Sequence, residues 1–560
     1  MALDNAFIAD QFSLLSKILD IHGEDPFKSR AYGSAAFAIE QLPVPLHQLP
    51  REELASLKGI GPSTSKKITE ILDTGVLADL QALLAKTPPG ILEMLRIKGL
   101  GPKKISVIWK QMGLETLGEL QYACEENRLL LFKGFGAKTQ ENIKQAIEFY
   151  QQHQGKFLYA EVEALLPSIQ QFLGQGLGTS RIAYSGAFRR QATTLDEMEW
   201  VVLLPNEKIK PLFQTERPPL LLEESPHHLL YQLQNGLKLK LSTGGDHLAG
   251  ALLRTTGPAS FLQWFEKKSK LPITQLPAAS REEELFQSAG LPWIPPFLRD
   301  WEDPEPFVVP EKLRQLVTPE SIKGIIHTHS NWSDGVNTLE EMAAACRDKG
   351  WEYLVVSDHS KSAAYAGGLP EKKIQEQHKQ INELNQRLAP FRIFKSIECD
   401  ILGDGSLDYS DDVLASFDLV IASVHSHLTM TEEKAMSRLL KAIENPYTTI
   451  LGHLTGRLLL SRAGYPLQMK KIIDACAAHQ VVIEINAHPR RLDLDWSWIP
   501  YALEKTVLLS INPDAHSIEG MNDCRYGVLA AQKGGLPTNR NLSSFSLKEF
   551  ENFLKQRKKK

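Results

Sequence analysis

The chain has 560 residues, a formal net charge of −4, 42% apolar residues and 23% charged residues, and it has roughly the length of three to five domains. No apolar run reaches the ~18 residues needed to cross a bilayer, and the N-terminus lacks a signal-peptide pattern, so we expect a cytoplasmic protein. The five cysteines form no CxxC pair, which argues against a cysteine-built metal site. Because the net charge is small, nucleic-acid binding would have to come from local basic patches.

The first 154 residues are predicted to be helical, because apolar residues recur every three to four positions. Within them one template occurs three times: an apolar residue, Lys, Gly, an apolar residue, Gly, and then a helix with polar groups in its first turn. The different segments between the copies favour separate modules over a regular solenoid. The copies are LKGIGPSTSKKITEIL (57–72), IKGLGPKKISVIWKQM (97–112) and FKGFGAKTQENIKQAI (132–147).

The next 150 residues read as an α/β segment followed by helices and a proline-rich stretch. A helix is predicted over 161–177, and strands over RIAYSG (181–186), EWVVLLP (199–205) and GLKLKLS (236–242). After a helical stretch, GLPWIPPFLRDWED (290–303) ends the region. We interpret DPEPFVVPEK (303–312) as a linker.

From residue 322 onward, apolar strand-like runs alternate with helical patterns, which predicts a β/α barrel. There are seven such runs. They are IKGIIHTHS (322–330), WEYLVVSDHS (351–360), FRIFKSIECDIL (391–402), FDLVIASVHSH (417–427), TTILGHLTGR (448–457), VVIEINAHP (481–489) and TVLLSINPDAHS (506–517).

Six of these seven runs carry His or an acidic residue at the predicted carboxyl end of the strand. In a β/α barrel these ends converge on one face, where active sites lie. Nitrogen and oxygen ligands without thiolate suit Zn²⁺, Mn²⁺ or Fe²⁺, and so large a set predicts two to three divalent ions. The candidate metal-ligating and catalytic residues are His327, His329, Asp334, His359, Glu398, His425, His453, Asp514 and His516.

The motifs HTHSNWSDG, VVSDHS, SIECDI, SVHSH, GHLTGR and NPDAHS resemble, in this order, those of the PHP (polymerase and histidinol phosphatase) domain. The resemblance implies a distorted β/α barrel with a trinuclear metal centre that hydrolyses phosphoesters, and it implies that the nine residues are ligands. Arg457, in GHLTGR, has two interpretations: it holds a phosphate oxygen, or it forms an ion pair at the barrel rim.

The KGIG, KGLG and KGFG turns match the helix-hairpin-helix pattern, in which backbone amides and a helix N-terminus hold a DNA phosphate without reading sequence. Lys67 also stands where family X polymerases carry a lyase lysine, although simple phosphate binding is the alternative. The predicted DNA-binding residues are Lys58, Gly59, Gly61, Lys66, Lys67, Lys98, Gly99, Gly101, Lys103, Lys104, Lys133, Gly134, Gly136 and Lys138.

Residues 5 to 550 resemble bacterial PolX, the family X DNA polymerase/3′-5′ exonucleases, whose thumb motif is close to GLPWIPPFLRDWED. The resemblance implies a multidomain α and α/β fold. Its predicted parts are an 8-kDa-like helical DNA-binding domain (1–90), a helix-hairpin-helix domain (91–154), a nucleotidyltransferase palm (155–245), a thumb with linker (246–312) and a PHP domain (320–560).

The palm departs from the family at the residues that polymerisation needs. The expected Gly-Ser is Gly186-Ala187, and the expected aspartate pair is Glu197 and Glu199. Lys240 replaces the third aspartate and would repel Mg²⁺, and Arg254-Thr255 replaces a Tyr-Phe pair. Arg189 and Arg190 are retained. These departures predict that the palm binds no Mg²⁺ and that polymerase activity is lost.

We therefore expect a bacterial DNA repair protein, associated with the nucleoid and monomeric, that acts as a metal-dependent 3′-5′ exonuclease on gapped, nicked or 3′-ended DNA. Two alternatives stay open. One is an active gap-filling polymerase with PHP nuclease activity, and the other is a non-catalytic DNA-binding scaffold.

Overall fold

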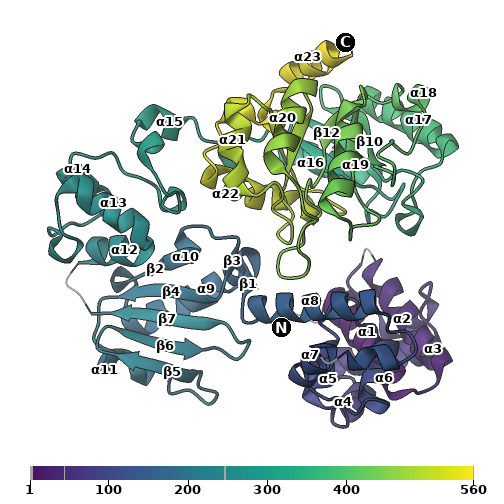
Figure 1. Ribbon diagram of the computed structural model, residues 1–560, viewed down its shortest axis with the longest axis horizontal. Coiled ribbons are helices and arrows are strands. Elements are labelled where there is room, and N and C mark those ends of the chain that lie inside the picture. The colour runs from purple at the N-terminus through teal and green to yellow at the C-terminus, as the bar shows by residue number, and fades with distance from the viewer. Residues whose placement is uncertain (1–3, 43, 126, 245–246, 559–560) are drawn as a thin grey trace. The chain divides into compact units, whose positions relative to one another are not determined.

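The computed structural model describes residues 4–42, 44–125, 127–244 and 247–558 (Figure 1). The chain forms two compact units, Met1–Gln154 and Gly155–Lys560. Within the described ranges, no helix combines the length and the apolar character that a membrane span requires.

The first unit is helical, as predicted. Its first two helices begin at N-cap aspartates, because Asp4 and Asp25 accept hydrogen bonds from the amides of Phe7 and Phe27. One cluster of buried side chains runs from Ile8 to Ile147, so segments 1–90 and 91–154 share a core. The helices are α1 (Asn5–His22), α2 (Pro26–Glu40), α3 (Pro62–Thr74), α4 (Ala78–Leu84), α5 (Pro89–Met94), α6 (Pro102–Lys110), α7 (Leu117–Glu125) and α8 (Ala137–His153).

The three repeated turns of this unit share one backbone conformation. In each turn the first glycine has a positive φ, of 85°, 88° and 96° at Gly59, Gly99 and Gly134, which other residues adopt only with strain. The apolar residue that follows is buried. The second glycine is the N-cap of α3, α6 or α8. Each turn therefore presents the amino end of a helix to solvent.

The second unit begins with a five-stranded mixed sheet, whose strand order is β2-β4-β7-β6-β5. Helix α9 (Tyr159–Leu177) and strands β2 (Ile182–Ser185), β4 (Glu197–Val202) and β7 (Lys238–Thr243) match the predicted elements. The hairpin of β5 (Leu220–Ser225) and β6 (His228–Gln232) was not predicted. Its edge strand β5 is exposed on nearly every residue and lacks the alternation of a half-buried strand.

Helices α12 (Leu248–Thr256), α13 (Ala259–Ser269) and α14 (Glu282–Ser288) pack around a separate apolar cluster. The predicted linker 303–312 contributes to this cluster. Phe307 is buried there, with its ring centroid 4.7 Å from that of Trp301, and α15 (Pro310–Arg314) begins before the segment ends. The segment is therefore packed, because its apolar residues have a core to enter.

The predicted barrel is confirmed. Seven parallel strands follow one another in chain order, and a bridge between Thr328 and Ala515 brings the last strand beside the first. Most of their residues are buried, which explains the continuous apolar runs of the sequence. The strands are β8 (Gly324–Thr328), β9 (Tyr353–Val356), β10 (Arg392–Asp400), β11 (Leu419–Ser423), β12 (Thr448–Leu451), β13 (Val482–Asn486) and β14 (Leu509–Asn512).

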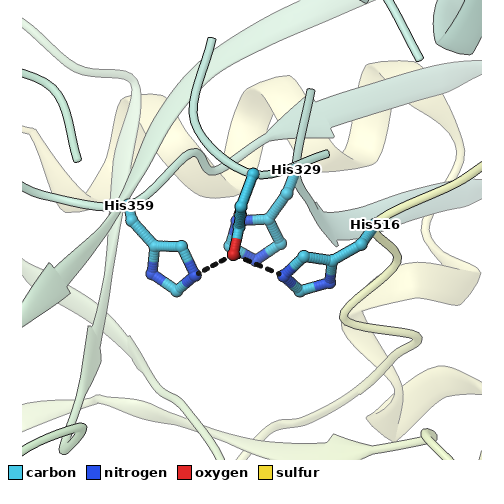
Figure 2. A group of neighbouring side chains, drawn as sticks. His329, His359 and His516 are labelled. Carbon is cyan, nitrogen blue, oxygen red and sulfur yellow. Dashed lines mark ion pairs between the residues drawn. The ribbon is translucent and has the colours of Figure 1, made fainter. Parts of the chain in front are cut away.

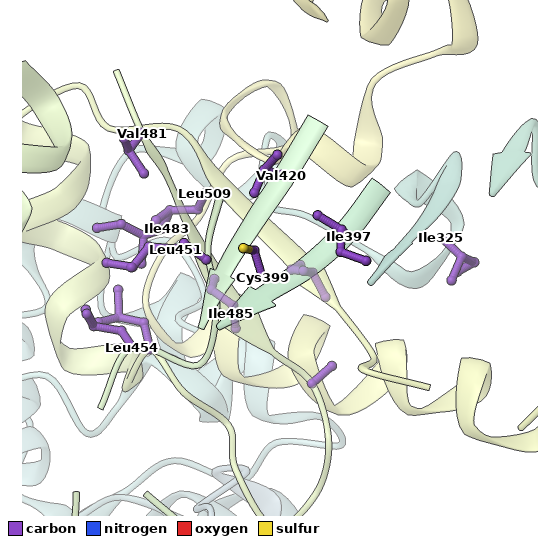
Figure 3. Packing of buried hydrophobic residues seen from close by; sticks show 14 of the residues in the cluster. Ile325, Ile397, Cys399, Val420, Leu451, Leu454, Val481, Ile483, Ile485 and Leu509 are labelled. Carbon is purple, nitrogen blue, oxygen red and sulfur yellow. The ribbon is translucent and has the colours of Figure 1, made fainter. Parts of the chain in front are cut away.

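Successive residues of the barrel strands enter two different cores. Ile325, Ile397 and Val420 belong to the larger cluster, some of whose members are drawn in Figure 3. Residues of the surrounding helices, such as Met342 and Ile472, belong to the same cluster. The neighbouring strand residues Ile326 and Leu419 join a second cluster with Phe550 of the last helix. The main covering helices are α16 (Leu339–Asp348), α17 (Glu371–Leu388), α19 (Glu432–Glu444), α20 (Met469–His479), α22 (Cys524–Lys533) and α23 (Leu547–Arg557).

Candidate metal centre

The nine predicted ligands come together at the carboxyl ends of the barrel strands. Figure 2 shows the rings of His329, His359 and His516 gathered at one point, where Oδ2 of Asp334 lies 3.5 Å from Nε2 of both His359 and His516. Eight of the nine fall into three overlapping groups, each able to hold a metal ion. The groups are His329, Asp334, His359 and His516; His327, His329, Glu398 and Asp514; and His359, Glu398 and His425.

Glu398, on β10, lies at the centre of this arrangement. Its Oε1 is 3.3 Å from Nε2 of His327 and 3.1 Å from Nε2 of His425. Its Oε2 is 3.1 Å from Nδ1 of His359. His453, the ninth predicted ligand, joins through Nε2, which lies 2.9 Å from the same Oε1. One buried carboxylate thus faces four imidazoles from four strand ends.

Three polar residues that hold the predicted ligands were missed by the sequence reasoning, two behind histidines and one behind Asp514. Oε1 of Glu484, on β13, lies 2.5 Å from Nδ1 of His327, and Oδ1 of Asp400 lies 2.5 Å from Nδ1 of His425. Asn486 donates to Asp514 at 3.1 Å. Carboxylates behind imidazoles fix the ring orientation of ligating histidines. The acidic residue inside the apolar strand run VVIEIN was the available signal for Glu484.

The electrostatics of the cluster are dominated by burial and by the carboxylates. Burial alone would lower the pKa of His359, but Glu398 and Asp334 outweigh it and raise that pKa to about 10. Similarly, Glu398 and Asp400 raise the pKa of His425 to about 9. Burial, with two neighbouring imidazoles, lowers the pKa of His329 to about 3. The imidazoles keep the pKa of Glu398 far below its usual value despite burial.

The donor atoms fit bound divalent cations. Nε2 of His327, Nδ1 of His329, Oε2 of Glu398 and Nδ1 of His453 are buried without a hydrogen-bond partner of good geometry. Such orphaned atoms are costly unless something else satisfies them. The backbone is also strained here, with φ of 66° at His327 and 54° at Asp514. Imidazole and carboxylate donors suit the same ions that the sequence suggested.

Two arginines of the barrel form ion pairs near the carboxyl ends of the strands. Arg457 donates through Nη1 to Asp495 at 2.7 Å and through Nε to the carbonyl of Arg491 at 2.9 Å, so it forms the rim ion pair, the second of its two interpretations. Arg491 was not singled out by sequence. Its Nε lies 3.6 Å from Oδ2 of Asp514, which places a guanidinium at the edge of the centre.

In the five-stranded sheet, Lys240 lies between the two glutamates. β4 and β7 are parallel neighbours with Glu199 opposite Lys240, and Nζ of Lys240 is 3.6 Å from Oε1 of both Glu197 and Glu199. Burial raises the pKa of Glu197 above its usual value, although Lys240 opposes this. Ala187 packs against the sheet core. An ammonium thus stands beside the carboxylates that would otherwise face a metal ion.

The two retained arginines are engaged in ion pairs. Nη2 of Arg189 lies 2.8 Å from Glu282, which is buried, and Nε of Arg190 lies 2.7 Å from Asp300. Asp300 also pairs with Lys533 of the barrel helix α22. Both guanidiniums therefore hold the sheet against the segment that follows it.

In the helical unit, the predicted DNA-binding lysines at the three turns are exposed: Lys58, Lys98 and Lys133. Lys67 is different, because its Nζ donates to Asp79 at 2.5 Å. Burial lowers the pKa of Lys67, but the bond to Asp79 outweighs this and leaves the pKa raised. Schiff-base chemistry needs a neutral amine, so this arrangement opposes it.

Comparison with known proteins gives three family models that match parts of the chain. A helix-hairpin-helix domain matches residues 3–77, a SAM-like helix-hairpin-helix tandem matches residues 91–148, and a PHP domain matches residues 326–488. The PHP match ends before Asp514 and His516, which the barrel nevertheless brings to the same cluster.

Curated proteins of two kinds are among those similar to this chain. The DNA polymerase/3′-5′ exonuclease PolX of Bacillus subtilis (strain 168) is 33% identical over 559 residues, which cover 96% of this chain and 97% of that protein. Probable phosphatases of Thermoanaerobacter sp. (strain X514) and Vibrio parahaemolyticus serotype O3:K6 are 24% and 26% identical. Their matches cover 42% and 41% of this chain and 95% and 91% of their own lengths.

Proposed function

The chain belongs to the PolX family of DNA polymerase/3′-5′ exonucleases, and from this premise we propose that it is a DNA repair nuclease. In this proposal the barrel removes nucleotides from 3′ ends at gaps and nicks. The helical unit binds the DNA backbone without reading sequence. The five-stranded sheet serves as a platform that no longer polymerises, and the protein acts as a monomer in the bacterial cytoplasm, at the nucleoid.

The observation that carries the nuclease proposal is the ligand cluster around Glu398. Four imidazole nitrogens lie within 3.3 Å of its carboxylate oxygens, and several of these buried donor atoms lack hydrogen-bond partners. We assign the nine predicted residues as ligands of two to three divalent ions, with Mn²⁺, Zn²⁺ and Fe²⁺ as candidates. Bound cations of this kind neutralise phosphate charge and lower the pKa of water.

The residues of the chain position the substrate and fix the ligands. We assign to Arg491 a contact with a phosphate oxygen, which is supported by the 3.6 Å between its Nε and Oδ2 of Asp514 at the edge of the cluster. Glu484 and Asp400 hold the rings of His327 and His425 in one orientation. Positions fixed to within about half an ångström are what such chemistry needs.

The proposed loss of polymerase activity is supported by Lys240. Its ammonium lies 3.6 Å from both Glu197 and Glu199 and offsets one of their two negative charges. A divalent ion bound to these carboxylates would be repelled by that ammonium a few ångströms away. Arg189 and Arg190 are also committed to Glu282 and Asp300, which leaves fewer donors for a triphosphate.

The test is a nuclease and extension assay on DNA with a one-nucleotide gap, carried out with Mg²⁺, Mn²⁺, Zn²⁺ and Fe²⁺ in turn. We expect shortening of the 3′ end, loss of this activity in His327→Ala, and no change in His479→Ala, whose imidazole is exposed on α20. Shortening that survives His327→Ala would contradict the nuclease assignment. Nucleotide addition that Glu199→Ala abolishes would contradict the loss of polymerase activity.

A further inference from the structure

Tyr365 lies at the tip of a loop that starts at the metal centre and returns to it. The loop follows His359, and the amide of Leu369 donates back to the carbonyl of His359 at 2.9 Å. Between these points Ser362 donates from its amide to Asp408 at 2.6 Å, and the amide of Lys361 donates to Tyr409 at 3.1 Å. The loop is therefore tied down at its base on both sides.

The side chain of Tyr365 is 75% exposed, although its neighbours Ala363 and Ala366 are buried. Its ring centroid lies 6.4 Å from that of His359, with 52° between the ring planes. Within the described part of the chain, its hydroxyl makes no hydrogen bond. A large aromatic ring held on a fixed loop, with little contact of its own, adds little to the stability of the barrel.

The electrostatic surroundings of the ring agree with a position over the centre. Partial burial and the charges of Asp400, Glu398 and Asp334 raise the pKa of Tyr365 to about 12, and Arg491 acts in the opposite direction. The ring of Tyr365 and the guanidinium of Arg491 are thus both near the acidic residues of the cluster.

We propose that Tyr365 stacks on the base of the 3′-terminal nucleotide and so positions the DNA end at the metal centre. This inference rests on the proposed nuclease function. The metal ligands alone would suit phosphoesters in general, and Tyr365 would add recognition of a nucleoside. Aromatic rings stack on any base, so the contact would be independent of sequence. Tyr365 then positions the substrate through its base, whereas the metal ligands and Arg491 act on the phosphate.

The first measurement needs no catalysis. DNA with a short 3′ overhang that ends in 2-aminopurine is bound in EDTA, and the fluorescence of this base reports stacking. We expect quenching with the unaltered protein and with Tyr365→Phe, and loss of the quenching with Tyr365→Ala. Because the side chain is exposed, neither change disturbs the core.

The second measurement compares removal of a 3′-terminal thymidine with removal of a base-free tetrahydrofuran residue from the same overhang. Stacking predicts that the unaltered protein and Tyr365→Phe prefer thymidine by about 10-fold in kcat/KM, and that Tyr365→Ala abolishes the preference. Equal slowing of both substrates by Tyr365→Ala, or undiminished quenching, would overturn the inference. Quenching that depends on Tyr365, without nucleotide removal in any metal, would instead support the contact and overturn the nuclease function.

Discussion

At the scale of single residues, the centre depends on groups that touch no substrate. Glu484 contacts His327 through one carboxylate oxygen and accepts from the amide of His453 through the other, at 2.7 Å. It also accepts from Asn512 at 2.8 Å. One side chain of β13 therefore contacts predicted ligands from two other strands, and this explains why a strand without a predicted ligand still contributes to the cluster.

Replacement of Glu484 by glutamine should keep the shape of this site but remove the charge behind His327. Loss of such a supporting carboxylate costs roughly 10–100-fold in metal affinity or activity. We expect weaker Mn²⁺ binding in calorimetric titration, with nuclease activity restored in part by excess metal. Glu444→Gln, an exposed change at the end of α19, is the control, and equal Mn²⁺ affinities of the two variants would rule out this role.

At the scale of elements, the three hairpin turns present their predicted groups to solvent, whereas the carboxylates of the β4–β7 pair are already paired with a lysine. The turns keep both the glycine conformation and the exposed lysines, so their predicted contact with DNA phosphates is geometrically available. The β4–β7 pair keeps its register, but the ammonium of Lys240 on β7 lies beside the carboxylate of Glu199 on β4. The apolar pattern of the strands thus maintains the sheet, although its polar residues differ from those expected of a polymerase palm.

The hairpins lead to a prediction about salt dependence. Replacement of Lys58, Lys98 and Lys133 together by alanine should weaken DNA binding at all sequences, because each lysine neutralises a backbone phosphate. The slope of log affinity against log salt should fall by about 3 in magnitude, close to one for each lysine. Fluorescence anisotropy between low and moderate salt measures it, and an unchanged slope would exclude these turns from the interface.

The β4–β7 pair leads to a prediction about pH. In Lys240→Ala, Glu197 and Glu199 lose their shared cation, and burial already raises the pKa of Glu197. An acid with a raised folded pKa costs stability above its unfolded pKa of about 4.5, and the cost is complete once the pH exceeds the folded pKa. The melting temperature of the variant should therefore fall further below that of the unaltered protein at pH 8 than at pH 5.

The matched control for this change is the double variant Glu197→Gln with Lys240→Ala, which removes one acid together with the cation. It should recover part of the melting temperature at pH 8. If the single variant loses the same melting temperature at both pH values, the ammonium does not compensate these carboxylates.

At the scale of the whole molecule, the two units have separate cores, and only the second contains the candidate centre. A metal that binds the folded barrel stabilises it by mass action, by about 2.7 kcal/mol when the free metal is 100 times its dissociation constant. Chelation should therefore lower the melting transition of residues 155–560 and leave that of residues 1–154 in place. Scanning calorimetry with and without EDTA tests this, and hydrogen exchange assigns the transitions.

The sequence by itself determined much of this protein. Strand runs and their alternation with helices predicted the barrel, repeated KG-x-G turns predicted the hairpins, and His or acidic residues at strand ends predicted the cluster, because these features depend on local spacing. Only the tertiary structure placed Glu484 behind His327, paired Arg457 with Asp495 and Arg491 with Asp514, packed the expected linker, and placed Lys240 beside two glutamates. Each of these depends on contacts between distant segments, which residue spacing along one chain does not encode.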